Sequence, residues 1–443
     1  MIKIKAFGGY SKIGKSMTAI DVDGEIIVTD IGADIEKLVD FEDEKSVISI
    51  HDTQALIENG VIPDDTAFFN ENGKKVKAIV LTHGHLDHIW GVPFLAAKYK
   101  CPVIGTQFTL KVLENLMANF KQKDLNLIRL NTGTQYKISD KVSVELVNIT
   151  HSIPNSAILV VHTIYGAVVY ANDWKLDDTP TLGQKPNYAR MQELGDKGVY
   201  ALILDSTNVD QEGYTFSESV VRTMLEDVIK KSLSNKTIFV TTFSSHIARI
   251  KNIIEISRKL NRQVLIFGRS MSMYISAAID TKIIEKSKFP EVITRRVKVN
   301  EILRYVRGKP GKYVIICTGH QGEKGAFLDK LVTGQYEYKL GNDDAVIFSS
   351  RVIPTSLNIA NRSMLQVALE RLNVNIADNI HVSGHGSKND YKLMLKMFRP
   401  KHLIPSHGGM DKISVAIDLA KDMGYELNKT SHILLNGQEL VLD

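Results

Sequence analysis

Cysteine is scarce in this chain, and its scarcity sets the first limit on the class of protein. Only Cys101 and Cys317 occur in 443 residues. Two cysteines cannot form the dense disulfide framework of a small secreted domain. Each lies in an apolar, strand-like run, so we expect buried thiols in a reducing cytoplasm.

Long apolar runs and a large excess of one charge are also missing. No run reaches the roughly 18 residues of a membrane span, and residues 1–5 lack a signal-peptide pattern. We therefore expect a cytoplasmic protein without a membrane partner. The net charge of +5 permits a nucleic-acid partner without arguing for one. The length and the hydrophobic content of 44% allow two or three domains with substantial cores.

The stretch His83-Gly-His85-Leu-Asp87-His88 follows an apolar run that is typical of a buried strand. Imidazole and carboxylate groups are metal ligands near neutral pH. His83 and His85 can point the same way, while Asp87 and His88 can reach a second ion. Two metals about 3.5–4 Å apart with a bridging water would generate hydroxide at neutral pH. The alternative, a polar loop with fortuitous histidines, does not explain four potential ligands in six residues.

The start of the chain predicts an antiparallel sheet. A glycine-rich loop, residues 8–16, follows a first strand, but no helix follows it, so we do not interpret it as a phosphate-binding motif. Strands 17–22 and 25–30 are joined by Asp23-Gly24, a strong hairpin signal. This opening disfavours a Rossmann fold. Residues 36–75 appear irregular and charged.

The second half of the chain has a different pattern of predicted strands and helices. Thr215 and Glu218 form a capping-box pattern for a helix that runs to about Leu233. Four apolar strands, near residues 237–242, 263–268, 312–317 and 344–349, then alternate with helices. This pattern predicts an inserted parallel α/β domain.

The motifs together resemble a known family. Thr82–His88 resembles the metallo-β-lactamase signature, and the α/β insertion resembles the β-CASP branch, which processes nucleic acids. The whole chain is most similar to ribonuclease J, in the shorter archaeal-type form. The sequences that carry this last resemblance are Gly8-Gly9, Asp205-Ser-Thr-Asn208, Thr318-Gly-His-Gln-Gly-Glu323, Ser349-Ser-Arg-Val-Ile-Pro354 and Val382-Ser-Gly-His385.

The resemblance implies an α/β fold: an αββα sandwich with an inserted parallel α/β β-CASP domain. It places the first part of the sandwich at residues 1–207, the insertion at 208–376 and the remainder at 377–443. It also implies that His83, His85 and His151 hold one metal, that Asp87, His88 and His407 hold the other, and that Asp173 bridges them. Asp30 would orient the metal loop, although a strand-end cap is the simpler interpretation of that residue alone.

Two divalent metals are expected, zinc or else manganese. By resemblance, the bridging hydroxide attacks phosphorus and releases a 5′-phosphorylated nucleotide, and His385, oriented by Asp205, steadies the phosphate or protonates the leaving oxygen. Ser383, Gly384, Gly386 and Ser387 either offer donors to a neighbouring phosphate or only permit a tight turn. Gly386 stands where the family more often has alanine.

Residues 286–312 contain nine Lys or Arg against two Glu. They are interpreted either as a wall that holds RNA or as a solvated helix face.

We therefore expect a metal-dependent 5′→3′ exoribonuclease that acts on single-stranded RNA, and by resemblance a homodimer. The alternatives are a β-CASP endonuclease of RNA 3′-end processing and a non-catalytic subunit of an RNA-processing complex. A non-catalytic subunit would have lost metal ligands, whereas every expected ligand is present.

Overall fold

The computed structural model describes residues 1–43, 51–120, 124–353 and 355–442. Pro354 of the ribonuclease J motif, and residues 44–50 of the expected irregular segment, lie outside the described residues. The chain forms two compact units, and the second is inserted into the first. Unit 1 consists of Met1–Leu176, Gln184–Thr215 and Gly384–Asp443, and unit 2 of Asp177–Gly183 and Phe216–Ser383. These units are defined by packing, so the expected domain division at 207/208 and 376/377 stays a prediction.

The first sheet of unit 1 has seven strands in the order β19-β1-β2-β3-β4-β5-β6. The Asp23-Gly24 hairpin joins β2 to β3 in antiparallel register, as the sequence predicts. From β3 to β6 the pairs are parallel. The strands are β1 (Ile2–Gly8), β2 (Met17–Val22), β3 (Glu25–Thr29), β4 (Val76–Leu81), β5 (Val103–Gly105), β6 (Leu127–Arg129) and β19 (Glu439–Leu442).

The second sheet has six strands in the order β18-β11-β10-β9-β8-β7. Its pairs β10–β11 and β11–β18 are parallel, so these three strands end at the same edge of the sheet. The strands are β7 (Gln135–Lys137), β8 (Ser143–Asn148), β9 (Ala157–Thr163), β10 (Gly166–Ala171), β11 (Val199–Asp205) and β18 (His402–Ser406).

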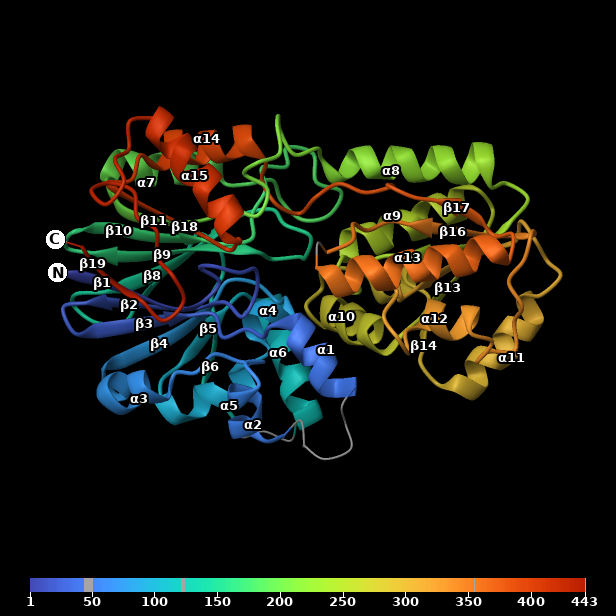
Figure 1. Cartoon of the computed structure of the whole chain (residues 1–443), viewed down its shortest axis with the longest axis horizontal. Helices are drawn as coiled ribbons and strands as arrows, with labels where there is room; N and C mark the ends of the chain where they lie inside the picture. Colours follow the sequence, from blue (N-terminus) through green and yellow to red (C-terminus); the bar gives the residue numbers. More distant parts are fainter. Residues whose placement is uncertain (44–50, 121–123, 354, 443) are drawn as a thin grey trace. The chain divides into compact units, whose positions relative to one another are not determined.

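The main core of unit 1 lies between the two sheets. Ile20 and Val80 of the first sheet join Val144, Leu159 and Ile203 of the second in one buried cluster. Helices cover the outer faces, with α7, α14 and α15 on one side and α3, α5 and α6 on the other (Figure 1). This arrangement confirms the αββα sandwich. The helices are α1 (Ile35–Asp43), α2 (Thr53–Glu58), α3 (Thr66–Asn72), α4 (Leu86–Ile89), α5 (Val92–Leu95), α6 (Gln107–Phe120), α7 (Tyr188–Lys197), α14 (Lys388–Phe398) and α15 (Met410–Asp422), with 3-10 turns η1 (Gly73–Lys75) and η2 (Ala96–Tyr99).

The expectation that residues 36–75 are irregular is wrong for the described part of that segment. It contains α1, α2 and α3, and the last two are only six and seven residues long. Asp52 caps α2 by accepting hydrogen bonds from two amides of its first turn. Helices this short carry too few apolar residues for a periodic pattern, which explains why the sequence did not reveal them.

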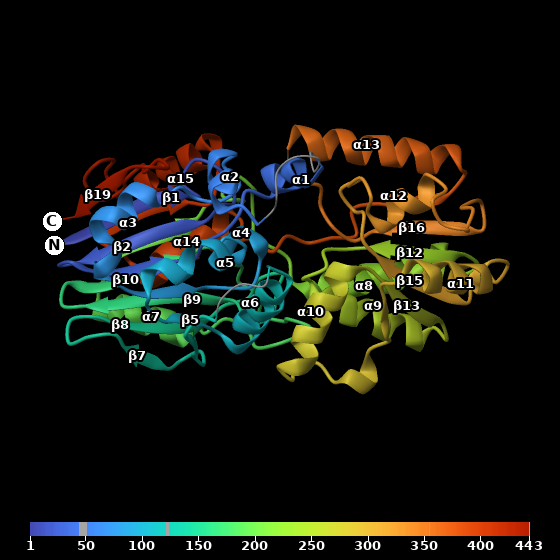
Figure 2. The ribbon, with the colours of Figure 1, turned by 90° about the horizontal axis from the view of Figure 1, so that it is seen from below.

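Unit 2 is built on a wholly parallel six-stranded sheet in the order β14-β13-β15-β12-β16-β17. Helices α9 and α10 lie on one face, and α12 and α13 on the other (Figure 2). This confirms the predicted parallel α/β insertion. The strands are β12 (Thr237–Thr241), β13 (Gln263–Phe267), β14 (Val292–Ile293), β15 (Tyr313–Cys317), β16 (Asp344–Phe348) and β17 (Asn375–Ala377). The helices are α8 (Glu218–Asp227), the π-helical turn η3 (Val228–Ser232), α9 (Ile247–Lys259), α10 (Arg269–Asp280), η4 (Lys286–Lys288), α11 (Arg296–Val306), α12 (Phe327–Val332) and α13 (Ser356–Arg371).

The predicted capping box at the start of α8 is wrong. Ser217 is the N-cap, and its hydroxyl accepts a hydrogen bond from the Ser219 amide. Thr215 instead donates its hydroxyl to the carbonyl oxygen of His385 at 2.8 Å. Glu218 turns into the interior of unit 2, where it pairs with Arg249. Both side chains therefore make contacts with residues distant in the sequence.

Across the described ranges, no helix is both long and apolar enough to span a bilayer.

Candidate metal centre

The expected site residues of unit 1 lie just beyond the carboxyl ends of its strands. Asp30 follows β3, His83 and His85 follow β4, and Asp173 follows β10. Strands in parallel pairs end at one edge, so these side chains come together although the sequence separates them. His151 follows β8, Asp205 ends β11 and His407 follows β18.

The first group of converging atoms comes from His83, His85, His151 and Asp173. One ligand atom of each lies within 4.8 Å of all the others. His85 Nδ1 lies 3.1 Å from His83 Nε2 and 3.2 Å from His151 Nε2. Asp173 Oδ2 is 3.5 Å from His83 Nε2 and 3.3 Å from His151 Nε2. Three imidazole nitrogens thus face one carboxylate oxygen.

The second group comes from Asp87, His88, Asp173 and His407, again within 4.8 Å. The other oxygen of Asp173, Oδ1, lies 3.2 Å from His88 Nε2 and 3.3 Å from His407 Nε2. Asp87 Oδ2 completes the group at 3.6 Å from His88 and 3.7 Å from His407. Asp173 therefore gives one oxygen to each group, which is the geometry that a bridging carboxylate requires.

Two atoms of this centre are orphaned. Within the described chain, His88 Nε2 and Asp173 Oδ1 are buried and have no hydrogen-bond partner. A buried polar atom without a partner costs free energy unless something else binds it. Both atoms point into the second group, so the donor set fits a cation there.

Electrostatics keep the first group in a form that binds metal. Burial, helped by the neighbouring His88, lowers the pKa of His83 to about 3. The pKa of His85 also lies well below its usual value, because of burial and the adjacent His83. Both rings are therefore neutral near neutral pH and carry a free lone pair.

Asp30 contacts both the turn after β4 and His88, and its orienting role stays a prediction. It is fully buried; its Oδ1 accepts the Thr82 amide at 2.9 Å, and its Oδ2 lies 2.8 Å from His88 Nδ1. A carboxylate on Nδ1 leaves Nε2 as the nitrogen with the lone pair. His151 is fixed similarly, since its Nδ1 donates to the Gly384 carbonyl at 2.7 Å.

The glycine-rich loop at residues 8–16 supports the candidate centre, which its sequence did not predict. The Ser16 amide donates to the Asp87 carbonyl at 2.9 Å, and the His407 amide donates to the Gly9 carbonyl. The Ser16 hydroxyl also lies 3.3 Å from His407 Nδ1. The loop thus connects the ligand turns after β4 and β18. The glycine pair was the signal in the sequence, and no helix follows the loop, since β1 leads into β2.

His385 and Asp205 form a pair beside the centre. His385 Nδ1 lies 2.7 Å from Asp205 Oδ2, and Thr207 holds the other oxygen of Asp205 through its amide at 2.8 Å. Burial opposes protonation of His385, but the carboxylates of Asp205 and Asp173 outweigh it and raise the pKa to about 9. The imidazole therefore carries a proton near neutral pH.

Much of the loop at residues 383–387 is engaged inside the protein. The Gly386 amide donates to the Trp174 carbonyl at 2.7 Å, and the Ser387 amide donates to Asp390 at 3.0 Å. The Ser387 hydroxyl lies 2.8 Å from the Thr215 hydroxyl. These contacts favour the tight-turn interpretation for Gly386 and Ser387. Ser383 is the last residue of unit 2.

The basic residues of the stretch 286–312 lie on η4 and α11 of unit 2 and in the loops beside them. Several of their charges are already paired. Lys288 Nζ lies 2.7 Å from Glu285, and Lys298 Nζ lies 3.2 Å from Glu291. Lys309 sits over the ring of Tyr305 at 3.1 Å from its centroid. The RNA-holding role of this stretch stays a prediction.

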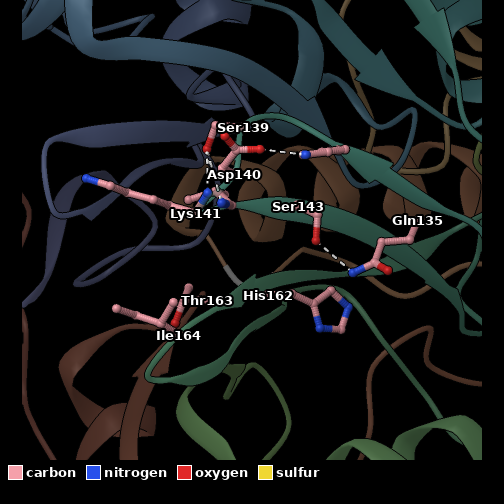
Figure 3. Close-up of a pocket in the computed structure, with 10 residues that line it drawn as sticks. Gln135, Ser139, Asp140, Lys141, Ser143, His162, Thr163 and Ile164 are labelled. Atoms are coloured by element: carbon pink, nitrogen blue, oxygen red, sulfur yellow. Dashed lines mark hydrogen bonds and ion pairs between the residues drawn. The ribbon is translucent and has the colours of Figure 1, made fainter.

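Unit 1 also has a surface hollow over β7, β8 and β9, which Figure 3 shows. Gln135 donates to the Ser143 hydroxyl there at 2.7 Å. The residues that line this hollow include Lys141, His162 and Ile164, and none of them is an expected site residue.

Three family models match consecutive parts of the chain. Residues 47–167 match the metallo-beta-lactamase superfamily, and residues 235–367 match the ribonuclease J beta-CASP domain. Residues 371–430 match the Zn-dependent metallo-hydrolase RNA specificity domain.

Curated proteins similar to this chain are ribonucleases of the J type. Ribonuclease J of Methanocaldococcus jannaschii is 41% identical over 99% of this chain and 98% of its own length. Ribonuclease J of Pyrococcus abyssi is 39% identical over 99% of this chain and 96% of its own length. Ribonuclease J 1 of Streptococcus pyogenes is 31% identical over all of this chain but 74% of its own length.

A crystal structure of a protein of unknown function from Enterococcus faecalis shares the fold with a TM-score of 0.66, at 17% identity and over the full length of both chains.

Proposed function

Because this chain belongs to the ribonuclease J family, we propose that it is a metal-dependent ribonuclease that degrades single-stranded RNA in the 5′→3′ direction. The observation that carries the proposal is the pair of ligand groups that share Asp173, beside the Asp205–His385 pair. The match of residues 371–430 to an RNA specificity domain supports RNA as the substrate.

We propose that each ligand group holds one divalent cation and that Asp173 serves both. Zinc suits five imidazoles and two carboxylates, and manganese is the alternative. When bound, the two cations lower the pKa of water, so that hydroxide is available to attack the phosphodiester at neutral pH. Elemental analysis of the purified protein should find two zinc ions per chain, and the Asp173→Asn variant should hold fewer.

His385 is the proposed proton donor. Because Asp205 occupies Nδ1, the proton on Nε2 is the one available to a substrate. Its transfer to the 3′-oxygen of the preceding nucleotide would let that oxygen leave as a hydroxyl. The product would be a nucleotide with a 5′-phosphate. A protonated imidazole also offsets the negative charge of the phosphate before the bond breaks.

The loop at residues 383–387 remains the proposed contact for a phosphate next to the scissile bond. Since the amides of Gly386 and Ser387 are engaged within the protein, other groups of the loop would have to make this contact. Comparing cleavage rates of RNA with a 5′-phosphate and RNA with a 5′-hydroxyl tests whether a 5′-end pocket exists.

The direction of degradation is tested with two RNAs of the same sequence, one linear with a 3′ label and a 5′-phosphate, the other circular. A 5′→3′ exonuclease shortens the linear RNA progressively, releases 5′-mononucleotides and leaves the circle intact. Cleavage of the circle would instead support the endonuclease alternative. Asp87→Ala and His385→Ala should abolish activity, while Asp140→Ala, which removes an exposed acid that belongs to neither ligand group, serves as the matched control.

Two further expectations stay proposals. Cytoplasmic action is supported by the free thiols of Cys101 and Cys317. The homodimer follows from resemblance, and sedimentation equilibrium tests it directly.

A further inference from the structure

Unit 2 contains a buried ion pair that the proposed reaction does not use directly. Arg249 of α9 is fully buried, and its guanidinium binds both oxygens of Glu218, with Nη2 at 2.7 Å from Oε2. Burial opposes ionisation of Glu218, but the charges of nearby His246 and of the guanidinium outweigh it and hold the pKa of the Glu218 carboxyl well below its usual range. Both side chains are therefore charged inside unit 2.

Glu218 lies next to the first two of the three chain segments at which the chain passes between the units. The connection at residues 177–183 is bound through Asp177, whose Oδ2 accepts the Glu218 amide at 2.9 Å. It is bound again through Asn252, which donates to Glu218 at 3.3 Å and to Thr181 at 2.9 Å. The second connection enters unit 2 at Phe216, two residues before Glu218 itself.

The third connection, residues 378–383, is held through Ser349. Arg249 Nη1 donates to the carbonyl of Ser349 at 2.7 Å and to its hydroxyl at 2.9 Å. The Ser349 hydroxyl in turn donates to the Ile380 carbonyl at 2.9 Å. One guanidinium thus lies at the middle of a network that reaches all three connections.

Two of the three segments lead directly to residues of the candidate centre. Asp173 lies four residues before Asp177, and His385 lies four residues after His381. In unit 1 the segments contact each other, since the Gly386 amide bonds to Trp174 and the Thr215 hydroxyl bonds to the His385 carbonyl.

A buried ion pair is a poor way to gain stability, because desolvation of the charges offsets their attraction. An apolar pair of similar size would pack α8 against α9 as well. What an apolar pair would not supply is the set of side-chain hydrogen bonds toward the first connection, through Asn252, and the third, through Ser349.

We propose that Arg249 is a positioning residue, which with Glu218 fixes these three connections and thereby holds His385 and its loop in the geometry of the reaction. This inference rests on the proposed ribonuclease function for its kinetic part only.

Two variants test it in the full-length, metal-loaded protein. Arg249→Gln with Glu218→Gln removes the charges together, so no buried charge is left unpaired. Ser349→Ala removes one hydroxyl and detaches only the third connection. Lys259→Gln is the matched control, because Lys259 pairs with Glu226 across the same two helices and contacts no connection.

We expect both test variants to bind two metals, to lower kcat roughly 10- to 100-fold, and to leave KM for a short RNA within about twofold. Hydrogen exchange at the Gly386 amide should rise, while exchange in the sheet of unit 2 stays unchanged. Unchanged kcat and exchange in both variants would refute the proposal, and so would faster exchange throughout unit 2, which indicates general destabilisation.

If the double variant does not fold, the kcat of Ser349→Ala and its exchange at the Gly386 amide test the proposal. If the wild-type protein does not cleave RNA, the proposed function fails, and exchange at Gly386 alone tests the positioning role.

Discussion

Replacing His381 with glutamine is expected to reduce the loss of stability on acidification. The side chain is largely buried in unit 2, and its Nδ1 has no hydrogen-bond partner among the described residues. Burial first, and then the charges of Arg249 and His246, lower the pKa of His381 to about 2. Glu218 opposes this effect and Arg351 adds to it. The folded protein therefore keeps this ring neutral down to strongly acidic pH.

The size of the effect follows from linkage between protonation and folding. Above pH ~6.5 the ring is neutral in both states, so it adds no pH dependence. Below that value the unfolded chain binds a proton that the folded chain does not, and the free energy of unfolding falls as the pH falls. Between about pH 7 and about pH 5.5 an unfolded-state pKa of ~6.5 gives a loss of about 1.3 kcal/mol from His381 alone.

Calorimetry of the wild type and His381→Gln at the two pH values measures this loss. Each kcal/mol of unfolding free energy corresponds to about 2–4 °C in Tm. On acidification the Tm of the wild type should therefore fall by roughly 3–5 °C more than that of the variant. Other buried histidines, such as His432 with its pKa of about 4, affect both proteins equally and cancel in the difference. The exposed His51 provides the control variant, His51→Gln. Equal losses in the wild type and His381→Gln would show that His381 is not kept neutral.

Three further results are expected. A Cβ at Gly386 would meet the Trp174 ring at 2.4 Å, so Gly386→Ala should lower the free energy of unfolding by about 1–3 kcal/mol and reduce activity. Adding Trp174→Leu removes the clash and should restore both, which a double-mutant cycle measures. Asp30→Asn should weaken metal binding about 10- to 100-fold, measured by chelator competition, because it loses the carboxylate that orients His88; unchanged affinity would contradict that role. Chelation should lower the Tm of the wild type but change that of Asp173→Asn much less, because metal at about 100 times its Kd stabilises by about 2.7 kcal/mol.

The parts of the fold that the sequence predicts well are those set by local patterns. The Asp23-Gly24 hairpin and the parallel strands of unit 2 follow from turn residues and apolar runs. The turn that carries His83, His85, Asp87 and His88 was equally clear, because four ligand types follow one buried strand. Short helices such as α2 could not be found this way, because too few residues carry their pattern.

Contacts between distant residues were the part that no local pattern revealed. His385 and Asp205 are 180 residues apart in the chain and were linked only through resemblance. Glu218 fits a capping box by spacing, yet its carboxylate binds the guanidinium of Arg249, 31 residues later. The spacing of Thr215 and Glu218 carries no information about that distant partner. Gly386 looked like a minor departure from the family, and its cause, the Trp174 ring, lies more than 200 residues earlier.

The backbone at the candidate metal centre shows why its residues do not follow local conformational preference. Asp30, Asp173 and His407 have φ values of 56°, 57° and 50°, in the left-handed region that side chains with a Cβ rarely adopt. Glycine would relieve a cost of about 1–2 kcal/mol at each position. It would also delete a group that orients the site or points into it. The three positions follow β3, β10 and β18 closely, and a left-handed turn there directs each side chain toward the shared edge of the sheets. Strain at three strand ends is thus the structural consequence of gathering two carboxylates and an imidazole at one point, and the packed sandwich behind them stabilises it.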